Sequence, residues 1–357
     1  MALPVLDDVI ARFSETIRDA GARKAPVRIR GGGTKDFYGG ALEGEVLETL
    51  IYAGVVDYEP TELVLTARAG TRLEEIEAQL RANGQMLAFE PPRFGAASTL
   101  GGVIASGLSG PRRPYAGSAR DHVLGVRILD GNGTDLKFGG QVMKNVAGYD
   151  VSRLMVGALG TLGLLLEVSL KVLPVPASDL TVRQERSHDA AIDLMNGWAG
   201  KPYPITATCH TDDTLYVRLS GADSAVRAAR TRLGGEALSE GDAFWSAIRD
   251  HTHAFFNPGE PLWRVSLKPT AQRITATGRE LVEWSGALRW ITGNVQPGPL
   301  RESAARAGGH ATLFRASEKA EGVFHPLPEP LMTLHRRIKS TFDPHGILNR
   351  NRMYPDL

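Results

Sequence analysis

Three consecutive glycines follow a short run of β-branched residues near the N-terminus, in the sequence Arg30-Gly31-Gly32-Gly33-Thr34-Lys35. Glycine adopts backbone conformations that are closed to other residues, so three in a row can turn several N–H groups into one concave anion-binding surface. Arg30, Lys35 and the Thr34 hydroxyl flank this surface and could offset the charge of a diphosphate. The pattern predicts a strand that ends in a diphosphate-binding turn, and an ordinary glycine-rich turn is the alternative that these six residues leave open.

Two common nucleotide-binding motifs do not fit the same letters. A Rossmann fingerprint that uses Gly31 and Gly33 requires glycine at position 36, where the sequence has Asp36. The phosphate-loop pattern Gly-x-x-x-x-Gly-Lys-Ser/Thr does not occur in the sequence. An NAD site of the Rossmann type and P-loop ATP chemistry are therefore both disfavoured.

Charge and cysteine content limit the possible partners and cofactors. With 41 basic and 40 acidic residues the formal net charge is +1, so no overall field draws nucleic acid to the surface. The single cysteine, Cys209, cannot form a disulfide, a zinc–thiolate site or a four-thiolate iron–sulfur cluster within the chain. Any redox chemistry of this chain must therefore use an organic cofactor.

The N-terminal residues do not resemble a secretory signal. Asp7 and Asp8 stand where a signal peptide would have a basic cluster before an apolar segment. No run approaches the eighteen or so apolar residues that a membrane span needs. We expect a cytoplasmic protein, with peripheral contact to the inner membrane through partners left open.

The first half of the chain mixes helical and strand-like patterns, which predicts an α+β lobe. Apolar residues at helical spacing predict a helix over residues 5–22, and a second helix over 71–83 opens with the capping-box pair Thr71 and Glu74. The expected strands are β-branched or apolar runs at 27–29, 46–51, 55–58, 63–67, 123–129 and 135–138.

A boundary is expected where a long apolar run, 162–173, ends at Pro174 and Pro176. Beyond it, short strands and helices follow in the order β-α-β-β-α, which is typical of an antiparallel sheet with helices on one side. The region 259–322 shows no clear pattern, and a last helix is expected over 329–342. We therefore predict three parts: a cofactor-binding domain at 1–176, a cap at 177–328, and a C-terminal segment at 329–357 that returns to the first domain.

A second group of small residues follows Pro91 and Pro92 and extends from Gly95 to Gly117. Its Gly, Ser and Ala residues are interleaved with apolar ones, a mixture that suits backbone packed tightly against something. Gly101 and Gly102 permit a close approach of the backbone to a ligand that lies between two lobes.

The order of these motifs resembles the FAD-binding domain of the vanillyl-alcohol oxidase and p-cresol methylhydroxylase (PCMH) superfamily. The motifs are the triple glycine, Thr99-x-Gly101-Gly102, Lys144-Asn145-Val146-Ala147-Gly148-Tyr149-Asp150 and Gly157-Ala158-Leu159-Gly160-Thr161-Leu162-Gly163. Within the superfamily, the Lys-Asn-Val-Ala-Gly-Tyr-Asp stretch is similar to the smaller FAD-binding subunits of bacterial glycolate oxidase, also called glycolate dehydrogenase. The resemblance covers residues 26–174 strongly and the C-terminal tail in part, while the middle of the cap matches only in size and texture.

The resemblance implies a two-lobed PCMH-type FAD-binding domain followed by an α/β cap domain with an antiparallel sheet. It implies that Gly31 to Thr34 hold the diphosphate, that Thr99 to Ser106 line diphosphate and flavin, and that Gly160 to Leu164 contact the isoalloxazine or adenine side. The tail residues Lys339, Phe342, Asp343, Pro344, Gly346 and Asn349 resemble a closing segment that returns to the flavin site. The residues expected to bind FAD are Arg30, Gly31, Gly32, Gly33, Thr34, Lys35, Pro92, Thr99, Gly101, Gly102, Ser106, Gly110, Tyr115, Gly117, Gly160, Thr161, Gly163, Leu164 and Asn349.

At several positions the sequence departs from the family pattern, and these departures predict differences in flavin attachment and metal binding. Some relatives have a histidine just after the glycines that bonds covalently to the flavin, but this chain has Thr34, so we expect noncovalent FAD. Leu159 stands where catalytic subunits and D-lactate dehydrogenases usually have glutamate. The His-x-Gly-Asp-Gly-Asn-x-x-His type metal stretch of those relatives does not occur here, so we expect no metal. Asn351 falls where a glycine is common in the tail.

Oxidation of a 2-hydroxy acid needs a base for the hydroxyl proton and a cation for the carboxylate. The cap offers histidines and basic residues for both roles, but none is singled out by spacing, and each histidine is more often a packed or surface residue than a base. The candidates are His210, His253, His310 and His325 for the base and Arg264, Lys268 and Arg289 for the cation. Of these we retain His210, Arg264, Lys268 and His310.

The expected function is that of an FAD-binding subunit in a glycolate oxidase complex, which oxidises glycolate to glyoxylate. The resemblance implies two partners, a larger FAD-containing subunit and an iron–sulfur subunit, since one cysteine cannot hold the cluster. Two alternatives stay open. One is a free-standing FAD-dependent oxidoreductase of another hydroxy acid or a polyol, and the other is a degenerate scaffold subunit that binds no flavin.

Overall fold

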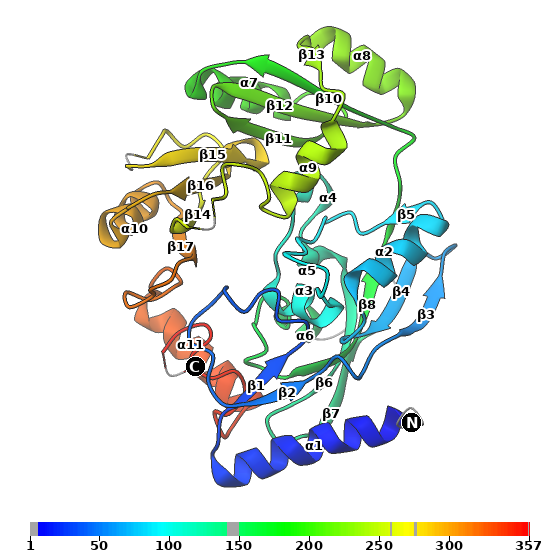
Figure 1. Ribbon diagram of the computed structural model, residues 1–357, viewed down its shortest axis with the longest axis vertical. Coiled ribbons are helices and arrows are strands. Elements are labelled where there is room, and N and C mark those ends of the chain that lie inside the picture. The colour runs from blue at the N-terminus through cyan, green and yellow to red at the C-terminus, as the bar shows by residue number, and fades with distance from the viewer. Residues whose placement is uncertain (1–5, 141–149, 258, 275–276, 356) are drawn as a thin grey trace.

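Two β-sheets dominate the computed structural model, which describes residues 6–140, 150–257, 259–274, 277–355 and 357. A five-stranded sheet is built by the first half of the chain, and an eight-stranded sheet is built by residues 178–315. Figure 1 shows the two sheets at opposite ends of the molecule, with α9 (Gly241–Arg249) between them. The predicted α+β class with an antiparallel cap sheet is confirmed.

The five-stranded sheet has the order β3-β4-β8-β6-β7 and is antiparallel throughout. Side chains of a strand alternate between its two faces, so Leu164 and Leu166 pack with α1 whereas Leu165 packs on the opposite side with α2 and α3. The elements of this half are α1 (Leu6–Arg23), β1 (Val27–Arg30), β2 (Glu45–Glu48), β3 (Val55–Glu59), β4 (Val64–Arg68), α2 (Leu73–Ala82), β5 (Gln85–Met86), α3 (Leu100–Ser106), α4 (Arg113–Ala116), α5 (Ala119–His122), β6 (Val123–Leu129), β7 (Asp135–Gly139), α6 (Val151–Leu154), β8 (Leu164–Lys171) and β9 (Leu173–Pro174).

The eight-stranded sheet has the order β13-β10-β12-β11-β15-β16-β14-β17. On β12, Leu215, Val217 and Leu219 pack under α7 and α8, while on the other face Tyr216 stacks on Phe244 of α9 and Arg218 pairs with Glu90 from the first half of the chain. The elements are β10 (Ser178–Glu185), α7 (His188–Ala199), β11 (Ile205–Thr211), β12 (Thr214–Gly221), α8 (Asp223–Leu233), β13 (Glu236–Ala237), α9, β14 (Leu262–Ser266), β15 (Arg279–Glu283), η1 (Trp284–Gly286), β16 (Leu288–Thr292), α10 (Pro297–Arg306), β17 (His310–Arg315) and α11 (Glu329–Phe342).

The chain after β17 returns to the first half of the molecule. Helix α11 covers the predicted residues, and beyond it Leu348 forms a parallel bridge with Val27 of β1. In Figure 1 the C-terminus accordingly lies beside α11 and close to β1. The triple glycine directly follows β1, so the tail lies next to the loop predicted to bind diphosphate.

One local prediction is wrong. The expected capping box of Thr71 and Glu74 is absent from α2, whose N-cap is Arg72, without a side-chain cap. The Thr71 hydroxyl instead donates to the Gly54 carbonyl at 3.1 Å and accepts from the Gly54 N–H at 2.9 Å. A partner distant in sequence therefore competes successfully for the group that would cap the helix.

Candidate functional site

A crevice of about 90 Å³ runs along the triple glycine at the end of β1. Four separate segments build it: the end of β1 with the loop after it, the first turns of α3, Leu159, and the C-terminal tail. Its lining residues are Ile29, Arg30, Gly31, Gly32, Gly33, Thr34, Lys35, Asp36, Leu42, Thr99, Gly102, Ala105, Ser106, Leu159, Asn349 and Arg352. The glycine loop, Thr99, Gly102, Ser106 and Asn349, all predicted to bind FAD, thus lie in one crevice.

The backbone N–H groups of residues 31–35 are left unused by the described part of the fold. Within the described part of the chain, none of these five groups donates a hydrogen bond. Backbone N–H groups are nearly always satisfied in folded proteins, by protein, water or ligand. Five successive free donors in residues that line one crevice fit an anion nest, and a diphosphate would supply the acceptors.

The three glycines are required by their surroundings as well as by the nest. A Cβ atom on Gly31 would lie 2.5 Å from the Thr99 hydroxyl oxygen, and one on Gly32 would lie 1.6 Å from the Ala97 carbonyl oxygen. Gly33 has a positive φ of 69° and would place a Cβ 2.4 Å from the Arg30 guanidinium. Because the Gly32 Cβ would meet backbone atoms that cannot rotate away, glycine at this position lets the loop lie directly against the segment before α3.

The two basic residues beside the nest are already engaged in the loop. The Arg30 side chain pairs with Asp36 at 3.0 Å and with Glu48 at 3.4 Å. The Lys35 ammonium donates to the Ser98 hydroxyl at 2.9 Å, and burial lowers its pKa to about 8. Both side chains therefore fix the shape of the loop, and the free N–H groups remain the main donors for an anion.

The tail closes the crevice from the opposite side. The side chain of Asn349 accepts from the Ile29 N–H at 2.7 Å and donates to the Leu159 carbonyl at 2.6 Å. Arg352, which sequence reasoning missed, donates to the Gly40 carbonyl at 2.6 Å and also to the Tyr38 carbonyl. Its proximity to Asn349 in the tail is the only signal in the sequence that could have indicated it.

A buried ion pair holds this tail in place. The Lys339 ammonium donates to the Asp343 carboxylate at 2.7 Å and to the Thr161 and Leu348 carbonyls at 2.8 and 2.9 Å. Asp343 is 1% exposed and also accepts from the Leu348 N–H at 2.8 Å. The pair therefore connects α11, the tail and the Thr161 turn.

We expect the substitution Asp343→Asn to lower the free energy of unfolding by about 2 kcal/mol, because Lys339 loses its charged acceptor in a buried site. Urea denaturation followed by circular dichroism measures this change. The matched control is Asp223→Asn, which removes an exposed acid from a pair with Arg227 at the same i,i+4 spacing. The control should change stability by no more than about 0.5 kcal/mol. Equal effects of the two substitutions would contradict the assigned role.

Other predicted FAD-contacting residues lie outside this crevice. Gly101 packs against Ala69, Gly163 against Leu129, and Leu164 is fully buried in the core behind α1. The Tyr115 hydroxyl is 2.8 Å from the Ser285 hydroxyl, and Gly117 ends α4 with a φ of 93°. The remaining positions are Gly160 beside Asn349, Thr161 in a neighbouring pocket, and Pro92 and Gly110 in the inter-lobe cavity described next. The stretch from Lys144 to Tyr149 lies outside the described residues.

A second, inner cavity lies where the cap meets the first half of the chain, and two residues predicted to bind FAD, Pro92 and Gly110, line it. It is lined by Pro92, Phe94, Leu108, Ser109, Gly110, Pro111, Ile248, Arg249, His251, Arg264, Glu283, Leu288, Trp290 and Phe314. Five polar side chains line this largely apolar space. Arg249 pairs with Asp250 at 2.7 Å and the Ser109 hydroxyl accepts from the Ala119 N–H at 2.9 Å, and the other three are Arg264 of β14, Glu283 of β15 and His251 after α9. Only Arg264 was a candidate from the sequence.

Burial perturbs all three groups. Burial raises the pKa of Glu283 to about 7, although the Trp290 N–H and the Arg264 guanidinium oppose this shift. Burial also lowers the pKa of His251 well below its usual value, with Arg315 and Arg264 acting in the same direction. At neutral pH the cavity therefore presents a neutral imidazole, a permanent cation and a carboxyl group near its titration point, a combination common at functional sites.

The other catalytic candidates lie apart from this cavity. The His210 Nε2 donates to the Arg186 carbonyl at 2.8 Å, and the ring packs against His188 on the side of α7. Lys268 and His310 are exposed, the first beyond the end of β14 and the second at the start of β17. Arg289 is completely buried and donates to the Gln272 carbonyl at 3.0 Å, so it supports the local backbone.

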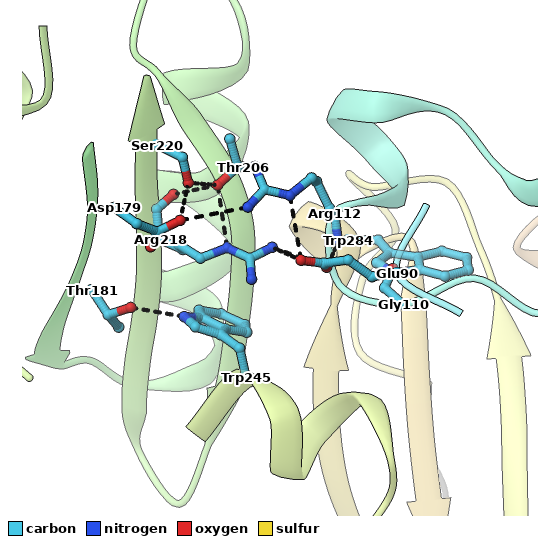
Figure 2. Close-up of polar contacts among 10 residues, drawn as sticks. All are labelled: Glu90, Gly110, Arg112, Asp179, Thr181, Thr206, Arg218, Ser220, Trp245 and Trp284. Atoms are coloured by element: carbon cyan, nitrogen blue, oxygen red, sulfur yellow. Dashed lines mark hydrogen bonds and ion pairs between the residues drawn. The ribbon is translucent and has the colours of Figure 1, made fainter. Parts of the chain in front are cut away.

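A buried ionic network joins the cap to the cavity wall (Figure 2). Glu90 accepts from Arg218 of β12 at 2.8 Å and from the Arg112 backbone N–H at 2.8 Å. Arg112 also contacts Asp179 of β10 at 3.5 Å, and the Trp284 indole donates to the Gly110 carbonyl at 3.1 Å. The network fixes β10, β12 and η1 against residues 110–112, which form one wall of the inner cavity.

The described residues contain no group of three or more His, Cys, Asp and Glu side chains placed to hold a metal ion. Across the same described ranges, no helix has both the length and the apolar character needed to cross a membrane.

Comparisons with known proteins agree with the geometry of the crevice. The family described as FAD binding domain matches residues 9–139. The glycolate oxidase subunit GlcE of Escherichia coli (strain K12) is 46% identical over 343 residues, covering 96% of this chain and 97% of that protein. The glycolate oxidase subunit GlcD of Bacillus subtilis (strain 168) is 30% identical over 199 residues, covering 54% of this chain and 42% of GlcD.

Among solved structures, alkyldihydroxyacetonephosphate synthase has the same fold at 15% identity, with a TM-score of 0.67 over 95% of this chain and 75% of that one. The prediction of an FAD-binding domain of the PCMH type is confirmed, and the near-complete coverage at 46% identity identifies the family within it. The chain belongs to the family of the glycolate oxidase subunit GlcE.

Proposed function

We propose that this chain is the FAD-binding subunit of a glycolate oxidase complex, and that it holds FAD noncovalently with the diphosphate on the nest of residues 31–35. The observation that carries the proposal is the row of five free N–H groups in a crevice of an FAD-binding domain. The relative that shares 46% of its residues is named as a glycolate oxidase subunit. FAD supplies a hydride acceptor for the oxidation of an alcohol to a carbonyl group.

The residues around the crevice would bind and orient the cofactor. The nest offers N–H donors, Thr99 offers a hydroxyl beside Gly31, and Asn349 and Arg352 hold the tail across the opening. The mixed glycine and apolar segment from Leu108 to Pro111 leads from this region to the inner cavity. A dinucleotide with its central diphosphate on the nest would therefore direct one of its two halves toward the inter-lobe space.

The side chains present support a noncovalent link. Thr34 follows the glycines, and a threonine hydroxyl is not a nucleophile that forms flavin linkages readily. Cys209 is fully buried on β11 of the cap and does not line the crevice. Burial, with Glu283 and Asp212 nearby, raises the pKa of its thiol well above the usual value, which makes the thiolate scarce.

The absorption spectrum of the purified chain tests the cofactor proposal. We expect flavin bands in the native protein and their complete transfer to the supernatant after acid precipitation. Flavin that stays in the pellet would contradict the noncovalent link. A colourless protein that does not take up added FAD would contradict the cofactor proposal as a whole and favour a scaffold subunit.

We further propose that the chain works with a larger FAD-containing subunit and with an iron–sulfur subunit, which passes electrons onward. One cysteine in the sequence is too few for a four-thiolate cluster, so a cluster would have to reside on a partner. Purification of the tagged chain from its native host tests this arrangement. Two co-purifying chains, one carrying flavin and one carrying iron and sulfide in stoichiometric amounts, are expected, and isolation of an active single chain would contradict it.

A further inference from the structure

The inner cavity is lined by a cation, Arg264, that forms no ion pair among the residues that the structure describes. Arg264 lies on β14, and its guanidinium stacks over the Trp284 ring with 5.2 Å between Cζ and the ring centroid. It forms no hydrogen bond or ion pair with any described residue. Burial lowers its pKa, and the Arg113 guanidinium acts in the same direction. Arg264 is half-buried. A guanidinium carries five donors and stays charged, so one without a protein acceptor in a partly desolvated site favours an anion in the space beside it.

A second guanidinium strengthens the positive potential at this point. Arg113, from the first half of the chain, lies over the same Trp284 ring at 4.5 Å. Trp284 and Ser285 have positive φ values of 55° and 56°, which are strained for residues with side chains. The Ser285 N–H donates to Thr208 at 2.9 Å and its hydroxyl contacts Tyr115, so neighbouring elements hold the strained turn. The fold therefore maintains a fixed platform for two cations beside the cavity.

Two other side chains that line the cavity, Glu283 and His251, each have a polar atom that could form a hydrogen bond with a ligand hydroxyl. Glu283 is 3% exposed, and one of its oxygens accepts from the Trp290 indole at 2.7 Å. The other oxygen, and the Nδ1 atom of His251, are buried and have no partner among the residues that the structure describes. Arg264 and Glu283 are both described and form no ion pair with each other. A cation and two unsatisfied polar atoms thus face one space.

The volume of the inner cavity limits the size of a ligand, and the neighbouring outer cavity indicates a route of entry. The inner cavity is about 20 Å³, which is room for about one water. An outer cavity of about 600 Å³ opens on the far side of Phe94, which lines both. Phe94 has a φ of 53° and is followed by Gly95 with a φ of 138°. A shift of the Phe94 ring into the outer cavity would join the two spaces and admit a ligand of a few heavy atoms.

Resting on the proposed function, we propose that this chain has its own binding site for a small 2-hydroxy carboxylate in the inner cavity. The carboxylate pairs with Arg264, and the hydroxyl lies between Glu283 and His251. Arg264 and Glu283 are then the residues that determine specificity for an acid with an adjacent hydroxyl group. The site would be additional to any that the larger subunit provides.

Calorimetric titration of the full FAD-containing chain, without an electron acceptor, tests the carboxylate contact. The probes are glycolate and glycolamide, which has the same shape without the charge. We expect glycolate to bind and glycolamide to bind at least about tenfold more weakly, because a hydrogen bond to a charged group is lost. Arg264→Met should weaken glycolate binding at least about tenfold, and Arg264→Lys should restore part of it. Arg232→Met, on exposed α8, removes the same charge far from the cavity and should leave binding unchanged.

The pH dependence of glycolate affinity tests the Glu283 contact independently of the Arg264 variants. Ionised Glu283 repels the ligand carboxylate, so affinity should fall as the pH rises through about 7. The charged or titratable groups around Glu283 are Arg264, Arg218, Arg249, Glu90, Cys209 and His251. Glu90 stays ionised, Cys209 stays protonated and His251 stays neutral near pH 7. The variant Glu283→Gln should therefore give a flat profile.

The outcomes separate this inference from the proposed function. A chain that carries FAD but binds glycolate no better than glycolamide would overturn the inference and leave the function in place. Unchanged affinity in Arg264→Met, or a loss of flavin in that variant instead of a loss of glycolate binding, would also overturn it. A chain that carries no FAD contradicts the proposed function before the titration begins.

Discussion

Replacing Gly32 by alanine is expected to abolish FAD binding by this chain. An ideal Cβ at this position would lie 1.6 Å from the Ala97 carbonyl oxygen and 2.5 Å from its carbonyl carbon. Both are backbone atoms, so the clash cannot be relieved by a change of rotamer. The loop would have to move away from residues 97–99, which breaks the crevice in which the free N–H groups converge.

Flavin absorbance per protein measures this effect, and circular dichroism of the same sample separates a loss of flavin from a loss of folding. Gly197→Ala is the matched control, because Gly197 lies inside α7 with nothing within 4 Å of its added Cβ. The control should keep its flavin and gain about 0.5–1 kcal/mol of stability, since alanine has a higher helix propensity than glycine. Full flavin content in Gly32→Ala would contradict the assignment of the nest.

Gly31 gives a graded comparison within the same loop. Its Cβ would meet the Thr99 hydroxyl, which is the end of a side chain and can rotate away. Gly31→Ala should therefore lose less flavin than Gly32→Ala, even though both residues line the same crevice.

Local sequence patterns were sufficient wherever neighbours in the chain decide the structure. The pattern over 329–342 predicted α11 with its observed bounds, because Pro344 and Gly346 end the helix from within a few residues. The β-branched run before the triple glycine likewise predicted a strand that ends at the glycines, as β1 does.

The sequence after residue 259 gave no clear prediction of helices and strands, because burial on both faces removes the polar and apolar alternation. All five residues of β16, from Leu288 to Thr292, are buried, and one of them is Arg289. Its two faces pack in different clusters, with Trp290 on one side and Ile291 on the other. A strand covered on both faces shows no alternation of apolar and polar residues, so the signal that sequence reasoning requires is absent.

The inner cavity could not be predicted for a different reason. His251, Arg264 and Glu283 come from the end of a helix and from two strands that are not adjacent in the sheet, β14 and β15. Only the strand order, with β16 between them, brings the three side chains to one space. The roles of Arg30 and Lys35 also depend on partners outside their own segment, Glu48 and Ser98.

The position of the cap over the cavity depends on the buried network around Glu90, and this dependence leads to the second large expected effect. The Glu90 side chain is 15% exposed, and those of Arg112 and Arg218 are 8% and 7% exposed. Burial alone would raise the pKa of Glu90, but the two guanidiniums outweigh it and the pKa lies below its usual value. The carboxylate is therefore ionised at neutral pH and compensates two buried cations from different lobes.

We expect Glu90→Ala to lower the free energy of unfolding by about 3–5 kcal/mol, because removing one partner of a buried ionic group leaves uncompensated charge behind. Guanidinium denaturation followed by tryptophan fluorescence measures the change. The control is Glu236→Ala, which breaks an exposed pair with Arg183 in the same cap sheet and should cost less than about 1 kcal/mol. Similar effects of the two substitutions would contradict the network's role.

The same network makes the stability of the fold depend on pH in the acid range, and the direction of the Glu90 pKa shift fixes the direction of that dependence. A carboxyl group with a lowered pKa in the folded chain contributes stability above its unfolded pKa and loses that contribution as the pH falls through the folded value. Wild-type stability should therefore decline below about pH 4.5 more steeply than that of Glu90→Ala, and the two curves should converge in acid. Parallel curves across this range would show that Glu90 is not the group that holds the cap against the cavity wall.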